Sequence, residues 1–316
     1  MRAQTASAIG VDLGATKIAA ALVSPQGQIV ASSQAPTLPA EGEEAVLGRI
    51  ATQVNALTAQ SPQAVAGVGI GSPGRVNPDE GIVHNAVNLG WEVVKLAAGV
   101  RSRLENDMPV WIDKDTNAGA LGEYYFGAAK GCRDFVYMAV GSGLGDGVFV
   151  NGGLVSGANY NASELGHLSL DPNGRECMCG LRGCAETVVS GNGLLAVTRE
   201  KLAEGKISTQ LTDSDSLTTA AIIAAARAGD ELALAALAEV ARWLGIVMAA
   251  CAAVTNPALI VLGGGLGLAA SEFLIPGACA ELQQRVLPAS RQRMQVAVSQ
   301  LTSSAVGAAT LVWHAQ

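Results

Sequence analysis

Three cysteines and a histidine lie close together near the middle of the chain. The motif reads Cys177-Met-Cys179-Gly-Leu-Arg-Gly-Cys184, and His167 precedes it by ten residues. One imidazole and three thiolates form a donor set that Zn²⁺ prefers, and four protein ligands leave no position for a catalytic water. The spacing therefore predicts a structural zinc site. Buried cysteines beside a core histidine, without metal, are the alternative that spacing leaves open.

Two glutamates flank this cluster. Glu164 stands three residues before His167, and Glu186 stands two residues after Cys184. A metal that holds the intervening segment would also fix the relative positions of the two carboxylates. We therefore interpret the zinc as a structural ion that positions the two glutamates, and the glutamates as ligand-binding groups.

Two glycine-bearing turns follow apolar runs that read as strands. The first is Asp12-Leu-Gly14-Ala-Thr16-Lys17, and the second is Gly141-Ser142-Gly143-Leu-Gly145-Asp146-Gly147. Neither matches a P-loop or a dinucleotide fingerprint. Glycine turns can nonetheless present several N–H groups to an anion, and Asp12 could hold Mg²⁺ beside phosphates, with Thr16 and Lys17 adding a hydroxyl and a charge. With Gly264 after a third apolar run, the pattern favours a nucleotide over ordinary hairpin turns.

A second acidic cluster ends another apolar run. The segment Val110-Trp-Ile-Asp-Lys114-Asp115-Thr-Asn117 places two acids and a lysine where a strand ends and a helix begins. Asp115 could be an N-cap for that helix. A carboxylate beside a phosphate site would instead suit a general base that accepts a hydroxyl proton.

Composition bounds the class of protein. The 316 residues favour two domains, and 49% hydrophobic with 15% charged residues describe a globular chain. A net charge of −7 argues against nucleic acid as a partner. Residues 1–7 contain no secretory signal, which predicts a cytoplasmic protein with reduced cysteines. The apolar run 243–262 is interrupted at Asn256-Pro257, so we interpret it as a buried helix followed by a strand, not as a membrane span.

The order of expected elements repeats. Strand, polar glycine turn, strand and small turn occur at 8–27 and again at 135–153. Helices are expected at 43–57, 94–105, 117–126, 217–228, 231–254, 276–286 and 305–313, and further strands at 28–33, 65–71, 110–112, 259–262 and 294–298. This alternation predicts an α/β protein with a mostly parallel sheet in each of two similar domains.

Taken in order, the motifs resemble those of the ROK (repressor, open reading frame, kinase) family of sugar kinases and sugar-responsive repressors. The matching segments include Gly69-x-Gly71-x-Pro73-Gly74, Asp115-x-Asn117, Glu164-x-Gly166-His167 and the cysteine motif with Glu186. The resemblance covers essentially the whole chain. It implies a two-domain actin-like or hexokinase ATPase fold of duplicated ribonuclease H-like units, with the active-site cleft between domains. We place the first domain at 1–117 plus about 303–316 and the second at 118–302.

The resemblance also implies roles for individual residues. Asp115 would be the base, and Gly74, Arg75, Lys114, Glu164, His167 and Glu186 would contact the sugar, with His167 also binding zinc. ATP and Mg²⁺ would be bound by Asp12, Gly14, Thr16, Lys17, Gly141, Ser142, Gly143, Gly145 and Gly264. The expected reaction is ATP-dependent phosphorylation of a hexose, with glucose as the first choice. The expected assembly is a homodimer or a tetramer, without nucleic-acid or membrane partners.

Two residues depart from the family pattern. Lys114 stands where asparagine is usual, and Asp146 stands where glycine is usual in the second phosphate loop. An ammonium group only donates hydrogen bonds, and a carboxylate repels phosphate unless it points away or meets Mg²⁺. Mannose, fructose, N-acetylmannosamine and N-acetylglucosamine therefore stay open as substrates, polyphosphate stays open as donor, and a sugar-binding sensor with weakened catalysis is an alternative. A repressor is less favoured, because the first strand already begins at Ala8 and a DNA-binding domain would have to precede it.

Overall fold

The computed structural model describes residues 6–315 and divides into two compact units. Unit 1 comprises Met1–Gly131, Gly153–Ser163 and Gln300–Gln316, and unit 2 comprises Cys132–Gly152 and Glu164–Ser299. The predicted boundary after residue 117 lies inside helix α3 (Asp115–Phe126), which stays whole in unit 1 because it packs against the C-terminal helix α10 (Ser304–His314). Residues 1–5 and 316, at the ends of the predicted first domain, lie outside the described residues.

Unit 1 is built on a five-stranded sheet in the order β3-β2-β1-β4-β8. Strands β1 and β2 pair antiparallel, as do β2 and β3, whereas β1, β4 and β8 run parallel. The sheet is thus mixed and not mostly parallel, because the short turns after β1 and β2 can join only antiparallel neighbours. Its strands are β1 (Ala8–Leu13), β2 (Lys17–Val23), β3 (Ile29–Pro36), β4 (Val68–Ser72) and β8 (Val110–Lys114).

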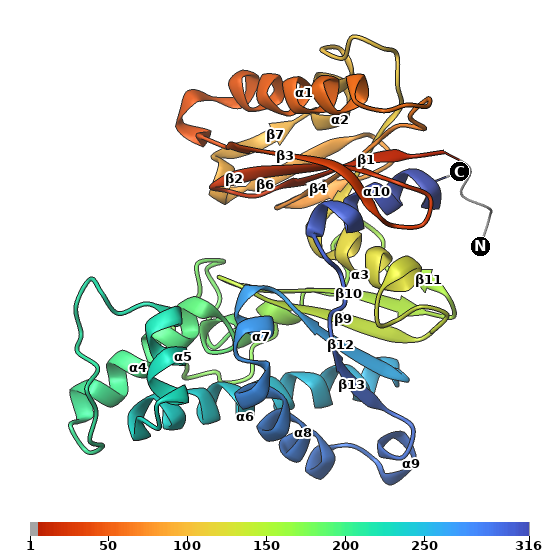
Figure 1. The fold of residues 1–316 in the computed structure, drawn as a ribbon. Coiled ribbons are helices and arrows are strands. Elements are labelled where there is room, and N and C mark those ends of the chain that lie inside the picture. The colour runs from red at the N-terminus through yellow and green to blue at the C-terminus, as the bar shows by residue number, and fades with distance from the viewer. Residues whose placement is uncertain (1–5, 316) are drawn as a thin grey trace. The chain divides into compact units, whose positions relative to one another are not determined.

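The two faces of this sheet are covered by different helices. Ile9, Val11 and Leu13 alternate along β1 and belong to the core that also contains the apolar side of α1 (Glu43–Ala59). The opposite face carries glycine where α10 crosses it: a Cβ on Gly10 would lie 1.8 Å from a carbonyl oxygen of α10. Figure 1 shows α1 and α2 (Leu96–Arg101) on one side of the sheet and α10 on the other. The helix therefore packs directly against the backbone of the strands.

A small antiparallel sheet in unit 1 was not predicted. It consists of β5 (Arg75–Asn77), β6 (Ile82–Ala86) and β7 (Trp91–Val94). The helix expected at 94–105 is consequently shorter, because residues up to Val94 pair with β6. Two short 3₁₀ turns, η1 (Pro39–Glu41) and η2 (Val87–Leu89), complete the unit.

Unit 2 repeats the strand order of unit 1. Strand β9 (Phe135–Val140) pairs antiparallel with β10 (Leu144–Val150) and parallel with β12 (Leu259–Gly263), which pairs parallel with β13 (Gln295–Val298). This is the same hairpin followed by two parallel strands as β2-β1-β4-β8. The structure confirms the duplicated α/β architecture expected from the sequence. The two-residue strand β11 (Gly153–Leu154) follows β10 along the chain and belongs to unit 1.

The helices of unit 2 include one long apolar helix, α6 (Glu231–Thr255). By length and composition alone α6 could cross a membrane, but 61% of its most apolar window is buried inside the protein. It packs against α4, α5 and α8, and Asn256 ends it in a left-handed conformation before β12. The interpretation as a buried helix that leads into a buried strand is confirmed. The remaining helices are α4 (Gly191–Glu204), α5 (Thr219–Arg227), α7 (Gly265–Ala269), α8 (Ser271–Arg285) and α9 (Pro288–Arg291).

Candidate active site and metal centre

The predicted site residues of unit 1 gather where three parallel strands end. Asp12 on β1 is in register with Gly71 on β4, and Gly71 is in register with Asp113 on β8. The carboxyl ends of parallel strands meet at one edge of a sheet, and ligands of α/β proteins bind there. The first glycine turn, the Ser72–Gly74 loop and the start of α3 at Asp115 therefore share one edge.

The first glycine turn is held closed by its own backbone. The Gly14 N–H donates to the Lys17 carbonyl at 3.0 Å, and the Thr37 hydroxyl donates to the Gly14 carbonyl at 2.7 Å. Thr16 and Lys17 are exposed at the tip. Asp12 accepts a hydrogen bond from the hydroxyl of Ser304, the first residue of α10. The turn thus presents a hydroxyl and an ammonium beside a carboxylate.

The environment of Asp12 changes its acidity. Burial raises the pKa of Asp12 above its ordinary value, and the Ser304 hydrogen bond and the Lys17 charge act in the opposite direction. A bound cation would restore the charged form, because it compensates the lost hydration of the carboxylate. Asp12 therefore fits a divalent-cation ligand.

The two acids at the end of β8 have different surroundings. Asp113 accepts hydrogen bonds from the Asn117 amide at 2.9 Å and from the Lys114 N–H at 2.6 Å. Burial raises the pKa of Asp113 despite these bonds. Asp115 is exposed, and its Oδ1 accepts from the Thr116 N–H at 2.7 Å. Asp113 with Asn117 thus supports the loop, whereas Asp115 presents its carboxylate at the surface.

Helix α3 begins one residue earlier than an N-cap role for Asp115 requires. The cap position is occupied by Lys114, whose side chain makes no capping hydrogen bond, and Asp115 is the first helical residue. The Lys114 ammonium instead donates to the Ser163 carbonyl at 3.1 Å.

Of the other predicted sugar contacts in unit 1, Gly74 has φ 90° and a Cβ there would lie 2.8 Å from the His84 carbonyl oxygen. This close approach fixes the loop that leads into Arg75 at the start of β5.

The second glycine turn connects β9 to β10 in unit 2. Its Gly141 N–H donates to the Gly143 carbonyl at 2.9 Å, and the first N–H of α4, at Gly191, donates to the Gly141 carbonyl at 2.7 Å. Ser142 is exposed, and Gly145 lies in the first part of β10. Gly264 has φ 80° and lies against the end of β9, where a Cβ would be 2.5 Å from the Val140 carbonyl oxygen. The predicted phosphate-binding glycines of unit 2 are therefore neighbours.

Glu186 bonds directly to this turn, and the residue after Glu164 bonds to Asp146. Glu186 lies in the 3₁₀ turn η4 (Ala185–Thr187), and its Oε2 accepts from the Leu144 N–H at 2.9 Å. A Cβ on Gly143 would lie 2.2 Å from the same oxygen, so a side chain there would displace the Glu186 carboxylate from this position. Glu164 immediately precedes the 3₁₀ turn η3 (Leu165–His167), and the Leu165 N–H donates to Asp146 Oδ1 at 2.8 Å. Asp146 is fully buried.

The four predicted zinc ligands converge in unit 2. One ligand atom each from His167, Cys177, Cys179 and Cys184 lies within 4.8 Å of the others. The Cys179 and Cys184 sulfurs are 3.6 Å apart, and Cys177 Sγ is 3.8 Å from His167 Nδ1. Tetrahedral Zn–S bonds of about 2.3 Å would separate two sulfurs by about 3.8 Å. The donor set therefore fits Zn²⁺, with Nδ1 as the histidine ligand.

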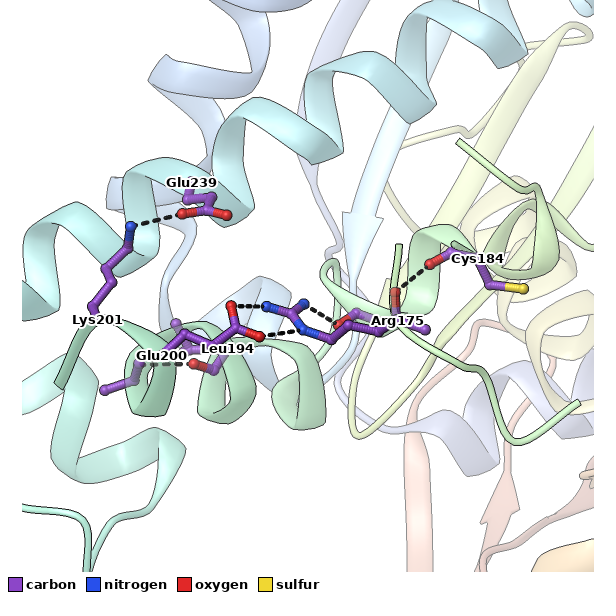
Figure 2. A network of polar contacts seen from close by, with 8 residues as sticks. Arg175, Cys184, Leu194, Glu200, Lys201 and Glu239 are labelled. Atoms are coloured by element: carbon purple, nitrogen blue, oxygen red, sulfur yellow. Dashed lines mark hydrogen bonds and ion pairs between the residues drawn. The ribbon is translucent and has the colours of Figure 1, made fainter. Parts of the chain in front are cut away.

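A salt bridge fastens the cysteine segment to α4. Arg175 donates to both carboxylate oxygens of Glu200 on α4, with the Nε to Oε1 bond at 2.8 Å, and its Nη1 donates to the Thr187 carbonyl at 2.8 Å. Figure 2 shows Arg175 between Glu200 and the segment that carries Cys184, with Lys201 paired to Glu239 next to it. Arg175 and Glu200 were not identified from the sequence. A lone Arg-Glu pair between distant segments leaves no spacing signal.

Comparison with known proteins agrees with this geometry. The ROK family model matches residues 8–315. The chain is 35% identical to a glucokinase of Halalkalibacterium halodurans over 277 residues, which cover 85% of this chain and 83% of that protein. It is 32% identical to a xylose repressor of Caldicellulosiruptor bescii, covering 95% of this chain and 76% of the repressor.

A solved structure matches the full length. The ROK family glucokinase from Streptomyces griseus, in complex with glucose and AMPPNP, is 31% identical and superimposes with a TM-score of 0.84 over 98% of this chain and 99% of that chain. The fold, the ordered motifs and the family match thus agree. The chain belongs to the ROK family.

Proposed function

We propose that this protein is an ATP-dependent hexose kinase that forms a sugar 6-phosphate, with glucose as the first substrate to test. The observation that carries the proposal is the exposed Asp115 carboxylate at the strand edge that also holds Asp12 and the first glycine turn. The similarity to a glucokinase solved with glucose and AMPPNP supports the pairing of hexose with ATP.

In the proposed reaction, Asp115 accepts the proton of the sugar 6-hydroxyl. The hydroxyl oxygen bonds to the γ-phosphorus while the bond from that phosphorus to the ADP oxygen breaks, so the proton ends on Asp115 and the electron pair on ADP. Lys17 and the Thr16 hydroxyl bind phosphate oxygens, and the N–H groups of the second turn bind others. Asp12 would hold Mg²⁺, which neutralises phosphate charge when bound.

The hydroxyl-binding groups are proposed to come from Glu164, His167 and Glu186, with Gly74, Arg75 and Lys114 from unit 1. A carboxylate accepts hydrogen bonds from hydroxyls and so distinguishes one arrangement of hydroxyls from another. His167 Nδ1 faces the sulfurs, which leaves Nε2 as the atom proposed to contact the sugar. Zn²⁺ would hold this segment in place when bound to His167 and the three cysteines.

A sugar-responsive regulator is the second candidate. Similarity to a xylose repressor favours it, as do the departures at Lys114 and Asp146. Measurement of ADP release across glucose, mannose, fructose, N-acetylmannosamine and N-acetylglucosamine separates the two, and a parallel reaction with polyphosphate tests the donor. Turnover with one or more sugars supports the kinase. Hexose binding by calorimetry without turnover would refute the kinase and favour the regulator.

We also propose a cytoplasmic homodimer, an assembly that rests on family resemblance. Light scattering at micromolar concentration should give twice the chain mass of 32.0 kDa. A mass of one chain would contradict it.

A further inference from the structure

The two residues that depart from the ROK pattern both hold the backbone next to Glu164. Lys114 Nζ donates to the carbonyl of Ser163, the residue before Glu164, at 3.1 Å. Asp146 Oδ1 accepts from the N–H of Leu165, the residue after Glu164, at 2.8 Å. The two unusual side chains thus form hydrogen bonds with the backbone on either side of Glu164, a proposed sugar ligand.

The backbone at this point needs such support. Ser163 has φ 61°, in the left-handed region that a residue with a side chain seldom adopts. Glu164 has φ −108° and ψ 59°, outside both the helical and the strand regions. Conformations of this kind persist where the surroundings over-determine them. Hydrogen bonds to charged groups are stronger than neutral ones, so Lys114 and Asp146 are suited to hold this conformation.

Asp146 is also placed so that its charge does not face the phosphate turn. It is fully buried on β10 and directs Oδ1 at the Leu165 N–H. The turn that starts at Leu165 lies close to β10: a Cβ on Gly166 would be 2.1 Å from the Leu144 carbonyl oxygen. Glycine at position 146 would leave the Leu165 N–H without this acceptor.

We infer that Lys114 and Asp146 are positioning residues that set the direction of the Glu164 carboxylate and thereby the hydroxyl pattern of the hexose that binds. This inference rests on the proposed sugar-kinase function. Asp146 needs no contact with the sugar or ATP for this role, and for Lys114 the role is separate from the sugar contact proposed above. The usual asparagine and glycine at these positions lack the long-reaching ammonium and the carboxylate, so the same glutamate would be held differently.

The test compares variants that remove the Lys114–Ser163 or the Asp146–Leu165 hydrogen bond with variants that keep it. Asp146→Ala and Lys114→Met remove the hydrogen bonds, whereas Asp146→Asn keeps an acceptor oxygen and Lys114→Arg keeps a donor. We expect Asp146→Ala and Lys114→Met to weaken hexose binding, measured by calorimetry without ATP, by about ten-fold or more. The conservative variants should recover most of that loss. Zinc content should stay at the wild-type value in all four.

A double-mutant cycle separates positioning from general destabilisation. If Asp146 acts through Glu164, Asp146→Ala should add little to Glu164→Gln. An equal loss in both backgrounds would overturn the inference, as would an Asp146→Ala variant that binds hexose as tightly as wild type. Should Asp146→Ala fail to fold, amide exchange at residues 163–167 in Lys114→Met against Lys114→Arg carries the comparison, because this exchange is measured without sugar.

Amide hydrogen exchange tests the positioning role of Lys114 and Asp146 independently of the proposed kinase function, because it requires no sugar. Amide exchange at residues 163–167 should speed up in Lys114→Met and Asp146→Ala, with the conservative variants near wild type. If no hexose binds the wild-type protein, the proposed function fails, and this exchange pattern still decides the positioning role. Unchanged exchange in both disruptive variants would refute it.

Discussion

Asp115→Asn tests the proposed base with little change in shape. The Asp115 Oδ1 that accepts from the Thr116 N–H has an equivalent oxygen in asparagine, so this hydrogen bond is retained. The variant loses one negative charge at the first residue of α3, worth about 0.3–1 kcal/mol through the helix dipole. Because the side chain is exposed, the substitution opens no cavity in the core. Stability should therefore fall by no more than about 1 kcal/mol.

The effect on turnover should be far larger. A positioned general base contributes about 10²–10⁴-fold, which corresponds to about 2.7–5.4 kcal/mol of barrier. Hexose affinity should change much less, because an amide still forms hydrogen bonds with a hydroxyl. The assay is ADP release at saturating ATP with the preferred sugar, together with calorimetric titration of that sugar.

Asp107→Asn is the matched control. Asp107 forms an exposed ion pair with Arg101, so its loss should leave turnover unchanged. Full turnover in Asp115→Asn would show that another carboxylate accepts the proton. Asp113 would be the next candidate, and the hydrogen bonds that its Oδ1 already accepts from Asn117 and from the Lys114 N–H argue against it.

Three further predictions concern the metal, the core and pH. Elemental analysis should find one zinc per chain, lowered by Cys179→Ser and unchanged by Cys279→Ser on α8, and a metal-free wild type purified without chelator would contradict it. Gly10→Ala should destabilise unit 1 by about 1–3 kcal/mol because its Cβ meets the α10 backbone at 1.8 Å, whereas Gly48→Ala on α1 meets nothing within 4 Å and should stabilise by up to about 1 kcal/mol in urea unfolding. Burial raises the pKa of Asp113 above 3.8, so the folded chain binds more protons and stability falls as pH rises through that window. Asp113→Asn removes this titration, and its free energy of unfolding relative to wild type should rise from about pH 4 to pH 7, while a constant difference would refute the assignment.

Features set by local spacing could be predicted from the sequence. The cysteine motif determines its own convergence, because glycine at 180 and 183 adopts the positive φ values that its tight turns need. The two glycine turns and their flanking strands were likewise predicted, since apolar runs of strand length ended at polar glycine segments.

Two elements whose formation depends on contacts with distant residues, helix α4 and the small sheet β5-β6-β7, were not predicted from the sequence. Helix α4 begins Gly191-Asn-Gly193, which reads as a turn, but the Ser190 hydroxyl caps it by accepting from the Gly193 N–H at 2.9 Å. Apolar Leu194 and Val197 repeat at helical spacing and are buried, and they are the signal that could have identified it. The small sheet β5-β6-β7 has strands of only three to five residues, too short for a clear alternation.

The direction of a buried charge could not be predicted. From the sequence, Asp146 is a carboxylate within a phosphate turn, and it should repel phosphate. Side chains alternate along a strand, so the choice between the two faces of β10 decides whether that carboxylate meets phosphate or the backbone of η3. The structure places it at the Leu165 N–H. Asp146, which the sequence indicates as unfavourable for phosphate binding, therefore forms a hydrogen bond with the backbone next to Glu164.

The same turn also carries the second glutamate. Leu144, between Gly143 and Gly145, donates its N–H to Glu186, while Asp146 two residues later accepts from the turn after Glu164. Groups proposed to bind phosphate and groups proposed to bind hydroxyls are therefore joined by direct hydrogen bonds within unit 2. Such a block transmits displacement because closely packed groups cannot move independently. Under the positioning role inferred for Asp146, part of the hexose specificity would depend on a residue that need not touch the sugar, and substitution of the proposed sugar ligands alone would leave that part in place.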